Sequence, residues 1–216
     1  KATFVFHDDQ VVPEGAVGLW ITGEHPVGKA IGHGWQPIGV PMLVTRAEGT
    51  TLLELGGRPA AVAFEEQLGL VPGALTPDIF WDTSIHYPFG LLQPDGSAVI
   101  RMARSKTPDG GLVIQGCVPQ PGSAVQVMYG DTDSLLGVVD EVVGEALDGR
   151  DGTGVLLVFS CAARATIYGA RAAEEARRLQ PAAGDVPVFG VYCCGEFART
   201  VGVLGTHNAT LTALAL

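Results

Sequence analysis

Positive charge is scarce in this sequence. Only 13 lysines and arginines stand against 23 aspartates and glutamates, which gives a net charge of −10. No run of Lys and Arg is present that could neutralise several phosphates, and an acidic surface repels both nucleic acid and anionic membranes. We therefore expect neither as a partner. The acidic surplus instead helps to keep a chain with 47% hydrophobic residues dispersed in water.

Long apolar runs are also missing. No window reaches the roughly 18 uninterrupted apolar residues of a transmembrane helix, and the apolar tail 209–216 is much too short. The first residues lead straight into Asp8 and Asp9, so no signal peptide is expected. These absences favour a soluble protein of the cytoplasm. Because the chain opens with Lys1 instead of Met, inside a strand-like run, we treat it as a candidate fragment of a longer protein.

Cysteine is rare, and the common motifs for metals and nucleotides are absent. The four cysteines, Cys117, Cys161, Cys193 and Cys194, form no C-x-x-C pair and no Cys/His ligand set, so we expect free thiols and no metal site. Few cysteines without an export signal fit a reducing compartment. The chain has no G-x-G-x-x-G opening a helix and no phosphate-binding loop ending in Lys-Ser/Thr. No cofactor is therefore expected.

The first part of the chain is rich in predicted strands. The alternation of apolar and polar residues predicts strands at 3–7, 16–22, 42–46 and 51–55, with an irregular crossing at 33–39. Pro59 suits the first position of a short helix that continues to about Leu68. A Pro- and Gly-rich boundary follows at 69–77. We therefore divide the chain into residues 1–69, mostly strands, and residues 70–216.

The second part alternates strands with helices. After a hairpin of strands 98–103 and 112–117, the pattern predicts strand 125–129, helix 132–147, strand 155–159, helix 163–179, strand 186–192 and strand 209–216. Asp131 is placed to cap the first long helix. This order predicts an α/β (or α+β) fold, with a mixed sheet, two βαβ crossovers and an antiparallel β-rich N-terminal segment. Antiparallel pairing with both helices on one face is the alternative.

Parallel strands would bring distant residues to one edge of the sheet. The carboxyl ends of the three predicted strands are Gly130-Asp131, Ser160-Cys161 and the run 193–196. α/β sheets usually bind ligands at that edge. We therefore expect these residues to converge on one crevice.

Two charged residues near this edge suggest a clamp for a zwitterion. Arg164 lies one turn into a helix whose N-terminus favours anions, lowers the pKa of a thiol such as Cys161, and leaves the guanidinium able to hold a carboxylate. Glu196 follows Gly195, which permits close backbone approach, and could receive an ammonium group. The alternatives are a buried Cys161 with a solvent-facing Arg164, and an ordinary salt bridge from Glu196 to Arg164 or Arg199.

Two further polar residues precede the last strand. His207 and Asn208 could add hydrogen-bond donors to the crevice, although a capped turn explains them as well. A nucleophilic pair of Cys161 or Cys194 with His207 can be drawn. Such pairs are defined by geometry and not by spacing, so we expect no catalytic residue.

Several segments resemble one known family. The ending from Val186 to Arg199 contains Pro187, Phe189-Gly190 and Gly195-Glu196, and His207-Asn208 with Thr210 follow. These residues resemble the close of FIST proteins, in which a "P-x-F-G-F-Y-x-x-G-E-I" segment precedes "H-N-x-T-x-x-x-L". The run 157–164 is similar to the family's "F-S-C-x-x-R". The segments 34–39 and 44–49 are similar to the end of its N-terminal region, of which this chain then carries only the tail.

The resemblance implies a sensory module found beside signalling domains, one that binds a small molecule such as an amino acid and has no catalytic residues. Its ligand-binding residues would be Ser160, Cys161, Arg164, Cys193, Cys194, Gly195, Glu196, His207 and Asn208. A signalling protein is the expected macromolecular partner. The alternatives are a protein-interaction adaptor with a vestigial pocket and a cysteine-dependent enzyme.

Overall fold

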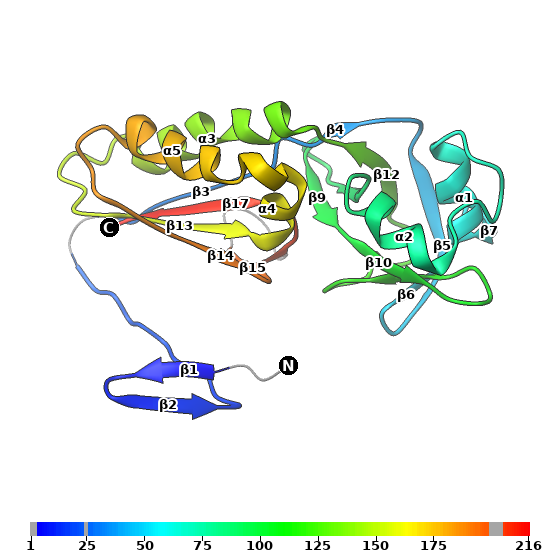
Figure 1. Ribbon diagram of the computed structural model, residues 1–216, viewed down its shortest axis with the longest axis horizontal. Helices are drawn as coiled ribbons and strands as arrows, with labels where there is room; N and C mark the ends of the chain where they lie inside the picture. Colours follow the sequence, from blue (N-terminus) through cyan, green and yellow to red (C-terminus); the bar gives the residue numbers. More distant parts are fainter. Residues whose placement is uncertain (1–3, 24–25, 199–204) are drawn as a thin grey trace.

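A computed structural model of the chain describes residues 4–23, 26–198 and 205–216. Two lobes form the main body, and each is built on one β-sheet (Figure 1). A two-stranded ribbon near the N-terminus lies apart from both lobes. The combination of helices with parallel and antiparallel strand pairs confirms the predicted mixed α/β class.

One lobe is built on a four-stranded sheet. Its strands lie in the order β14 (Val188–Cys193), β13 (Leu156–Cys161), β17 (Leu211–Ala215) and β3 (Gly28–Gly32). β13 runs parallel to β14, while β17 is antiparallel to both of its neighbours, β13 and β3. Helices α3 (Thr132–Leu147) and α5 (Ala173–Ala183) cover one face, and the side chains between helices and sheet form the core of this lobe.

The other lobe is built on a nine-stranded antiparallel sheet. Its main path is β10 (Ala103–Lys106), β11 (Leu112–Ile114), β6 (Thr51–Leu55), β5 (Met42–Glu48), β12 (Ala124–Tyr129), β8 (Phe89–Leu92) and β9 (Ala98–Arg101). The short strands β4 (Gln36–Pro37) and β7 (Arg58–Pro59) pair with β12 and β6. Helices α1 (Ala60–Gln67) and α2 (Pro77–Ser84) pack on it through the tilted rings of Phe64, Phe80 and Phe89.

Helix α3 has the bounds that the sequence predicts. Asp131 caps it, because its side chain accepts a hydrogen bond of 2.8 Å from the backbone N–H of Ser134. Its apolar residues at helical spacing, Leu135, Val139, Val142 and Ala146, are buried in full. The helical spacing of the apolar residues, the N-cap and the burial of side chains therefore agree along this helix.

The predicted helix 163–179 is wrong in one respect that matters for the site. It divides into α4 (Ala162–Tyr168), a 3₁₀ turn (Gly169–Arg171) and α5. Gly169 has a φ of +54°, a conformation that interrupts an α-helix and that glycine tolerates best. The break separates α4 from α5, and the carboxylate of Glu175 on α5 is buried in the protein interior.

The predicted pair of βαβ crossovers is only half correct. β13, α4, α5 and β14 form one crossover between parallel strands. β12 belongs to the nine-stranded sheet, so α3 connects one sheet to the other. Hydrophobic periodicity predicts strands but does not specify their partners, and here the partner of β13 on its second side is β17.

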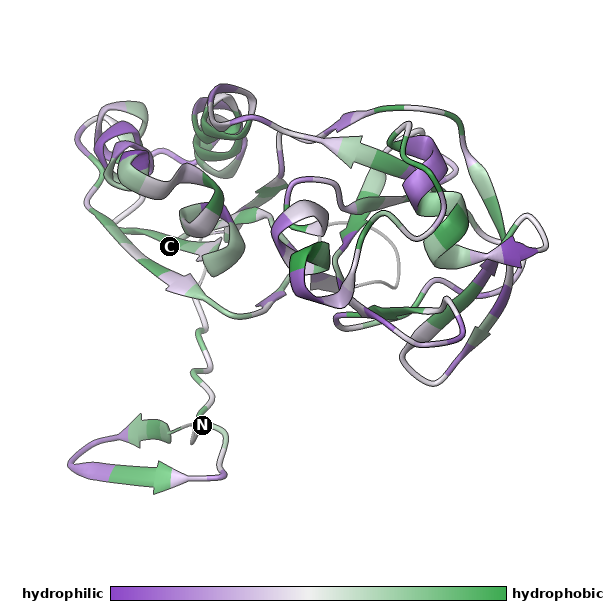
Figure 2. Cartoon of the chain, turned by 45° about the vertical axis from the view of Figure 1, so that its right-hand side comes forward, coloured by the Kyte–Doolittle hydropathy of each residue, from purple (hydrophilic) through white to green (hydrophobic). Residues whose placement is uncertain are grey.

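The N-terminal strands also differ from the prediction. No strand is found at 16–22. Instead β1 (Phe4–His7) pairs with β2 (Gln10–Pro13), which lies between the two predicted strands. The predicted residue 3 lies outside the described residues. Figure 2 shows hydrophobic stretches in this ribbon, where Phe4 and Phe6 are exposed.

The predicted hairpin of 98–103 and 112–117 is also wrong. β10 and β11 form the hairpin. A break at Met102 divides the expected first strand, and its first part, β9, pairs with β8 instead. The side chains of Arg101 and Ala103 therefore belong to different strands.

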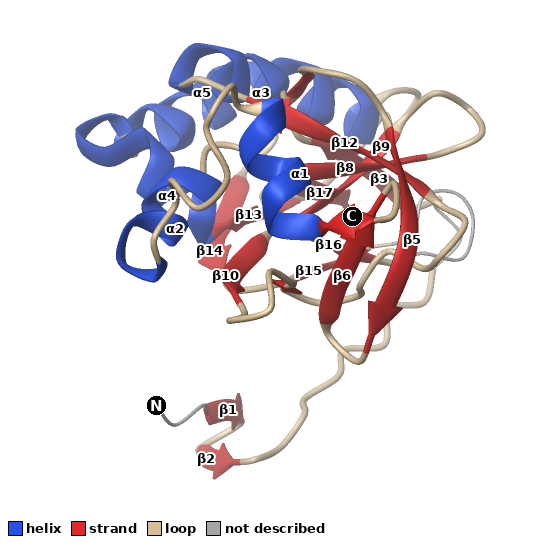
Figure 3. Ribbon diagram, turned by 90° about the vertical axis from the view of Figure 1, so that its right-hand side faces the viewer, coloured by secondary structure: helices blue, strands red, loops and turns tan. Residues whose placement is uncertain are grey.

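Both sheets combine strands from either side of the predicted division at residue 69. β3 completes the four-stranded sheet beside β17, and β5 and β6 lie within the nine-stranded sheet. In Figure 3, helices α3, α4 and α5 gather on one side of the molecule. None of the helices in the described ranges has the length and apolar character needed to cross a bilayer.

Replacing Gly28 with alanine tests the packing of β3 against α3. A Cβ atom on Gly28 would lie 1.9 Å from the backbone oxygen of Ala146, so strand or helix must move. We expect urea denaturation to show a loss of about 1–3 kcal/mol in the free energy of unfolding, as overpacking usually causes. Gly18→Ala is the matched control, because a Cβ there meets no atom within 4 Å. Equal stability of both variants would contradict the packing of β3.

Candidate functional site

A cleft of about 850 Å³ lies in the described structure. Its walls come from the segment between β3 and β4, the β8–β9 turn, helix α3 and the start of β17, and they include Ile31, His33, Trp35, Asp95, Val99, Ser134, Glu141, His207 and Thr210. Small-molecule sites usually occupy about 300–1,000 Å³. The cleft therefore has the size of a ligand site, and it is formed by segments from both ends of the chain.

Two histidines on the cleft wall are held in the neutral form. Burial lowers the pKa of His33, and the nearby Arg164 and His207 lower it further. Burial also lowers the pKa of His207, with Arg101 adding to the effect. The Nδ1 atom of His33 accepts a 3.0 Å hydrogen bond from the backbone N–H of Trp35, and Nε2 of His207 donates to the Ala198 carbonyl at 2.9 Å. Both rings therefore present fixed tautomers near neutral pH.

Trp35 joins the two lobes at the floor of the cleft. Its indole N–H donates to the carbonyl of Ala209 at 3.0 Å, just before β17. The same ring packs against Gly130, where an added Cβ would lie 2.8 Å from it. The end of β12 and the start of β17 therefore meet through one tryptophan, although they belong to different sheets.

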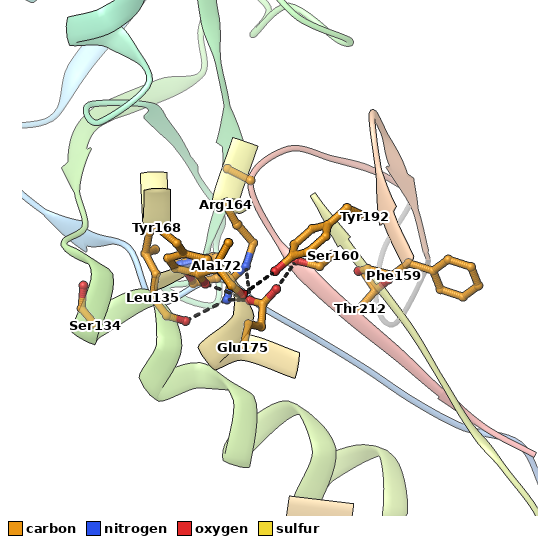
Figure 4. A network of polar contacts seen from close by, with 12 residues as sticks. Ser134, Leu135, Phe159, Ser160, Arg164, Tyr168, Ala172, Glu175, Tyr192 and Thr212 are labelled. Atoms are coloured by element: carbon orange, nitrogen blue, oxygen red, sulfur yellow. Dashed lines mark hydrogen bonds and ion pairs between the residues drawn. The ribbon is translucent and has the colours of Figure 1, made fainter. Parts of the chain in front are cut away.

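Arg164 is the centre of a buried network and is not exposed to a ligand. Its side chain is 0% exposed, and its carboxylate partner is Glu175, whose Oε1 accepts from Nε at 2.9 Å and from Nη2 at 2.7 Å (Figure 4). Nη1 and Nη2 also donate to the carbonyls of His33 and Leu135 at 3.1 and 2.8 Å. All three nitrogen atoms of this guanidinium bond other parts of the fold, which neither the predicted clamp nor its solvent-facing alternative anticipates.

Glu175 receives the rest of the network. Burial raises its pKa, but the charge of Arg164 and three sets of hydrogen bonds outweigh burial, so the pKa is lowered overall. The hydroxyl of Ser160 donates to Oε2 at 2.6 Å, and that of Tyr168 donates to Oε1 at 2.8 Å. Ser160 lines a separate hollow of about 210 Å³ between α5 and the sheet. The carboxylate is therefore ionised and satisfied.

A second buried cluster gathers Cys161, Cys193 and Glu196. The two cysteines are register partners on β13 and β14, and Glu196 opens β15 (Glu196–Phe197), which pairs with β16 (Thr206–His207). The Cys193 thiol and the Thr210 hydroxyl donate to Glu196 at 3.4 and 3.3 Å. The predicted convergence of these strand ends is thus present for residues 161, 193 and 196.

The thiols of this cluster are not activated. Burial and the nearby Glu196 raise the pKa of Cys161 to about 11 and that of Cys193 to about 12. The expected lowering of the Cys161 pKa by a helix N-terminus is therefore wrong, since desolvation and a carboxylate outweigh the short helix α4. Burial also raises the pKa of Glu196, and its partners in the described residues are thiols and a hydroxyl instead of a cation.

The remaining predicted residues lie around this cluster. Cys194 is exposed, Gly195 precedes Glu196, and Asn208 is buried with its side-chain oxygen unpartnered in the described structure. Among the nine predicted residues, His207 alone lines the large cleft. Arg199, an alternative partner of Glu196, lies outside the described residues.

Sequence reasoning missed the residues that make the opposite wall. His33, Trp35, Ser134 and Glu141 belong to a non-periodic crossing and to the polar side of α3. The available signal was the run 33–39, which carries His, Trp and Gln among glycines and has neither helical nor strand periodicity. Such a run suggests an irregular segment that approaches another part of the chain.

Removing one partner of the buried ion pair should be costly. Arg164→Met leaves the Glu175 carboxylate buried without its cation, and we expect a loss of about 3–5 kcal/mol in the free energy of unfolding, measured by urea denaturation. Glu174→Gln is the control, because Glu174 bonds the exposed Arg171 on the outer side of α5 and surface pairs contribute little. A similarly small effect of Arg164→Met would show that the network is not needed for stability.

The order of thiol labelling tests the chemistry of the cysteine cluster. We expect iodoacetamide at neutral pH to modify the exposed Cys117 and Cys194 first, and Cys161 only after unfolding, because its thiol is buried and protonated. Mass spectrometry after short pulses gives the order. Rapid labelling of Cys161 in the folded protein would contradict its burial.

The chain is similar to two curated mycobacterial proteins. It is 29% identical over 218 residues to "Uncharacterized protein Rv0628c" of Mycobacterium tuberculosis and 30% identical over 218 residues to "Uncharacterized protein Mb0898c" of Mycobacterium bovis. These alignments cover 96% of this chain but only 54% and 55% of the relatives. The chain thus spans about half the length of the curated relatives it matches. No solved structure matches it significantly.

Two family models match consecutive parts of the sequence. The FIST N domain matches residues 1–58, and the FIST C domain matches residues 60–199, more than half of the chain. The second match includes the strand ends at Ser160 and Glu196 and the buried network between them. The segment that carries His33 and Trp35 falls in the first match. The chain therefore belongs to the FIST domain family, whose domains are associated with sensory signal transduction.

Proposed function

We propose that this chain is a non-catalytic sensory module that binds an amino-acid-like metabolite in the cleft and passes its occupancy to a signalling partner. The family association with sensory signal transduction and small-ligand binding supports the class of function. The names of the two relatives, both described as uncharacterized, suggest no ligand. The choice of ligand therefore rests on the chemistry of the cleft.

The observation that carries the proposal is the construction of the cleft itself. Its walls combine the crossing around His33, the β8–β9 turn, helix α3 and the start of β17. A ligand that touches all four segments would stabilise the mutual position of the two lobes. Occupancy can then be converted into a change of lobe arrangement, because a ligand favours the conformation that it binds best.

The polar groups of the cleft suit a small molecule with both donors and acceptors. Glu141 presents a carboxylate from α3, where an ammonium group would be favoured. The hydroxyl oxygen of Ser134 can accept a hydrogen bond on the same helix, and the rings of His33 and His207 line the other sides. Apolar contact comes from Ile31 and Trp35. An amino acid of moderate size has this combination of groups.

The state of the cysteines supports a non-catalytic role. A thiol acts as a nucleophile in its ionised form, and burial beside Glu196 raises the pKa of both Cys161 and Cys193 far above neutrality. Nε2 of His207 is engaged with the Ala198 carbonyl and not with a sulfur atom. These observations disfavour the cysteine-dependent enzyme that the sequence left as an alternative.

An uncovered sheet face supports a second candidate, a protein-interaction adaptor. On the face of the four-stranded sheet opposite α3 and α5, Phe159, Phe189 and Val191 are 39%, 68% and 47% exposed. Contiguous exposed apolar side chains often mark interaction surfaces. The two candidates differ in whether the cleft must bind a metabolite for the partner to bind.

Filling the cleft from helix α3 tests the sensor proposal. Gly137 lines the cleft, and a Cβ there meets no atom within 4 Å, so Gly137→Phe should place a ring in the cleft without disturbing the helix. In wild-type protein we expect at least one member of an amino-acid panel to raise the thermal midpoint, because a ligand stabilises the state it binds. Gly137→Phe should abolish that rise.

Gly144→Phe is the matched control. Gly144 lies on the same helix with equally open space around its Cβ but outside the cleft, so this variant should keep the ligand-induced rise. Native mass spectrometry of freshly purified protein should show a bound metabolite in the wild type and in the control alone. If no amino acid shifts the wild-type midpoint and no metabolite co-purifies, the adaptor replaces the sensor.

A further inference from the structure

The charged groups on the cleft wall all have the same sign. Among the described residues that line the cleft, the carboxylates are Asp95 and Glu141, and no lysine or arginine is present. Both residues are exposed and line the cleft, so a ligand can contact them. The cleft therefore offers two negative charges to its occupant.

The two histidines of the wall do not offset these charges. Burial lowers the pKa of both His33 and His207, so both rings are neutral near pH 7. A neutral imidazole contributes hydrogen-bonding atoms and an apolar ring face but no net charge. The carboxylates of Asp95 and Glu141 therefore remain the charged groups that a ligand meets on the described wall.

Two arginines lie behind the wall without lining it. Arg164 is 0% exposed, and its charge is balanced by Glu175. Arg101 is 1% exposed and lies close enough to His207 to lower its pKa. Even if the charge of Arg101 is counted in full, one positive charge stands against the two carboxylates of the wall. The described surroundings of the cleft are therefore negative in sum.

The two carboxylates come from different elements. Asp95 lies in the turn between β8 and β9, where its Oδ1 accepts hydrogen bonds from the backbone N–H and the hydroxyl of Ser97 at 2.9 and 2.7 Å. These bonds lower the pKa of Asp95, so its carboxyl group is ionised at neutral pH. Glu141 belongs to helix α3. A ligand that pairs with both must therefore carry two separate positive groups.

Helix α3 forms a wall along which an extended ligand can lie. Four of its residues, spaced three and four apart and thus on one face, line the cleft: Ser134, Gly137, Val138 and Glu141. At 1.5 Å per residue they cover roughly 10 Å of the helix. Gly137 leaves open space in the middle, since a Cβ there meets no atom within 4 Å. This wall suits an aliphatic chain that lies beside Val138 and ends near Glu141.

We propose that the cleft selects ligands that carry two ammonium groups and, among amino acids, the basic ones such as lysine. The inference rests on the proposed function, because it names the class of ligand that the same cleft takes. Asp95 and Glu141 pair with the two ammonium groups, and Val138 contacts the methylene chain between them. The side-chain amide of Gln36, also on the wall, is a neutral donor for the carboxylate of an amino acid.

Acidic and neutral amino acids fit this wall less well. The side chain of a glutamate-like ligand would bring a further carboxylate toward Asp95 and Glu141, and like charges repel. A neutral amino acid forms one ion pair fewer, and charge-assisted hydrogen bonds are about twice as strong as neutral ones. The net charge of −10 also attracts cations toward the protein at long range.

Ligands that differ in a single group test this preference. L-Lysine and L-norleucine share their backbone and methylene chain, but norleucine lacks the terminal ammonium. By isothermal titration calorimetry at neutral pH and low salt, we expect lysine to bind at least tenfold more tightly than norleucine, and L-glutamate to bind most weakly. Added sodium chloride should weaken the binding of lysine more than that of norleucine, because exposed charges are screened.

Variants of the two carboxylates connect the preference to the cleft. Glu141→Gln and Asp95→Asn remove a charge and keep the shape, and the amide oxygen at position 95 can still accept from Ser97. Each should weaken lysine binding about tenfold and leave norleucine binding nearly unchanged. Asp140→Asn is the matched control, since Asp140 is exposed on α3 but does not line the cleft. An equal effect of Asp140→Asn would show that only the overall charge matters and would overturn the proposal.

The outcomes separate this inference from the proposed function. If norleucine or glutamate binds as tightly as lysine and Gly137→Phe abolishes that binding, the sensor stands and the preference for two ammonium groups is wrong. If 1,5-diaminopentane binds and no amino acid does, the preference stands and the amino-acid ligand is wrong. Lysine binding that survives Gly137→Phe would place the ligand outside the cleft and overturn both. Both also fail if none of these four molecules binds.

Discussion

The lobe built on the four-stranded sheet depends on the ion pair between Arg164 and Glu175. Arg164 comes from α4 and Glu175 from α5, and the pair also holds the Ser160 hydroxyl of β13 and the Leu135 carbonyl of α3. Two buried charges lose their hydration and persist only where each is matched and hydrogen-bonded. That requirement ties three helices and one strand of the sheet to a single geometry. The helix must also break at Gly169, because a continuous helix would hold Arg164 and Glu175 too far apart along its axis to bond.

The same network forms the back of the cleft. Nη1 of Arg164 donates to the carbonyl of His33, which fixes the crossing that carries His33 and Trp35. Trp35 then reaches the carbonyl of Ala209 and joins the two lobes. A buried, hydrogen-bonded arginine thus positions the wall of the cleft without lining it.

Local patterns predicted local structure well and tertiary partners poorly. Helix α3 has the predicted bounds, cap and buried stripe, because these depend on residues within one turn of each other. The convergence of Cys161, Cys193 and Glu196 also follows from the order of the elements. The predicted zwitterion clamp assumed that Arg164 was free. The predicted helix 163–179 continued through Gly169, where the backbone leaves the α-helical conformation, so the pairing of Arg164 with Glu175 was not anticipated.

The sequence by itself determined the acidic character, the mixed α/β class, the membership in the FIST family and the polar residues that close the chain. The tertiary structure alone decided which of these residues are available to a ligand. Arg164 and Arg101 have the same chemistry, and nothing in their neighbouring residues tells them apart. Their difference arises from contacts with residues distant in sequence, a carboxylate for one and two carbonyls for the other. Spacing along a chain sets the secondary structure, but the satisfaction of a buried charge depends on how the elements pack.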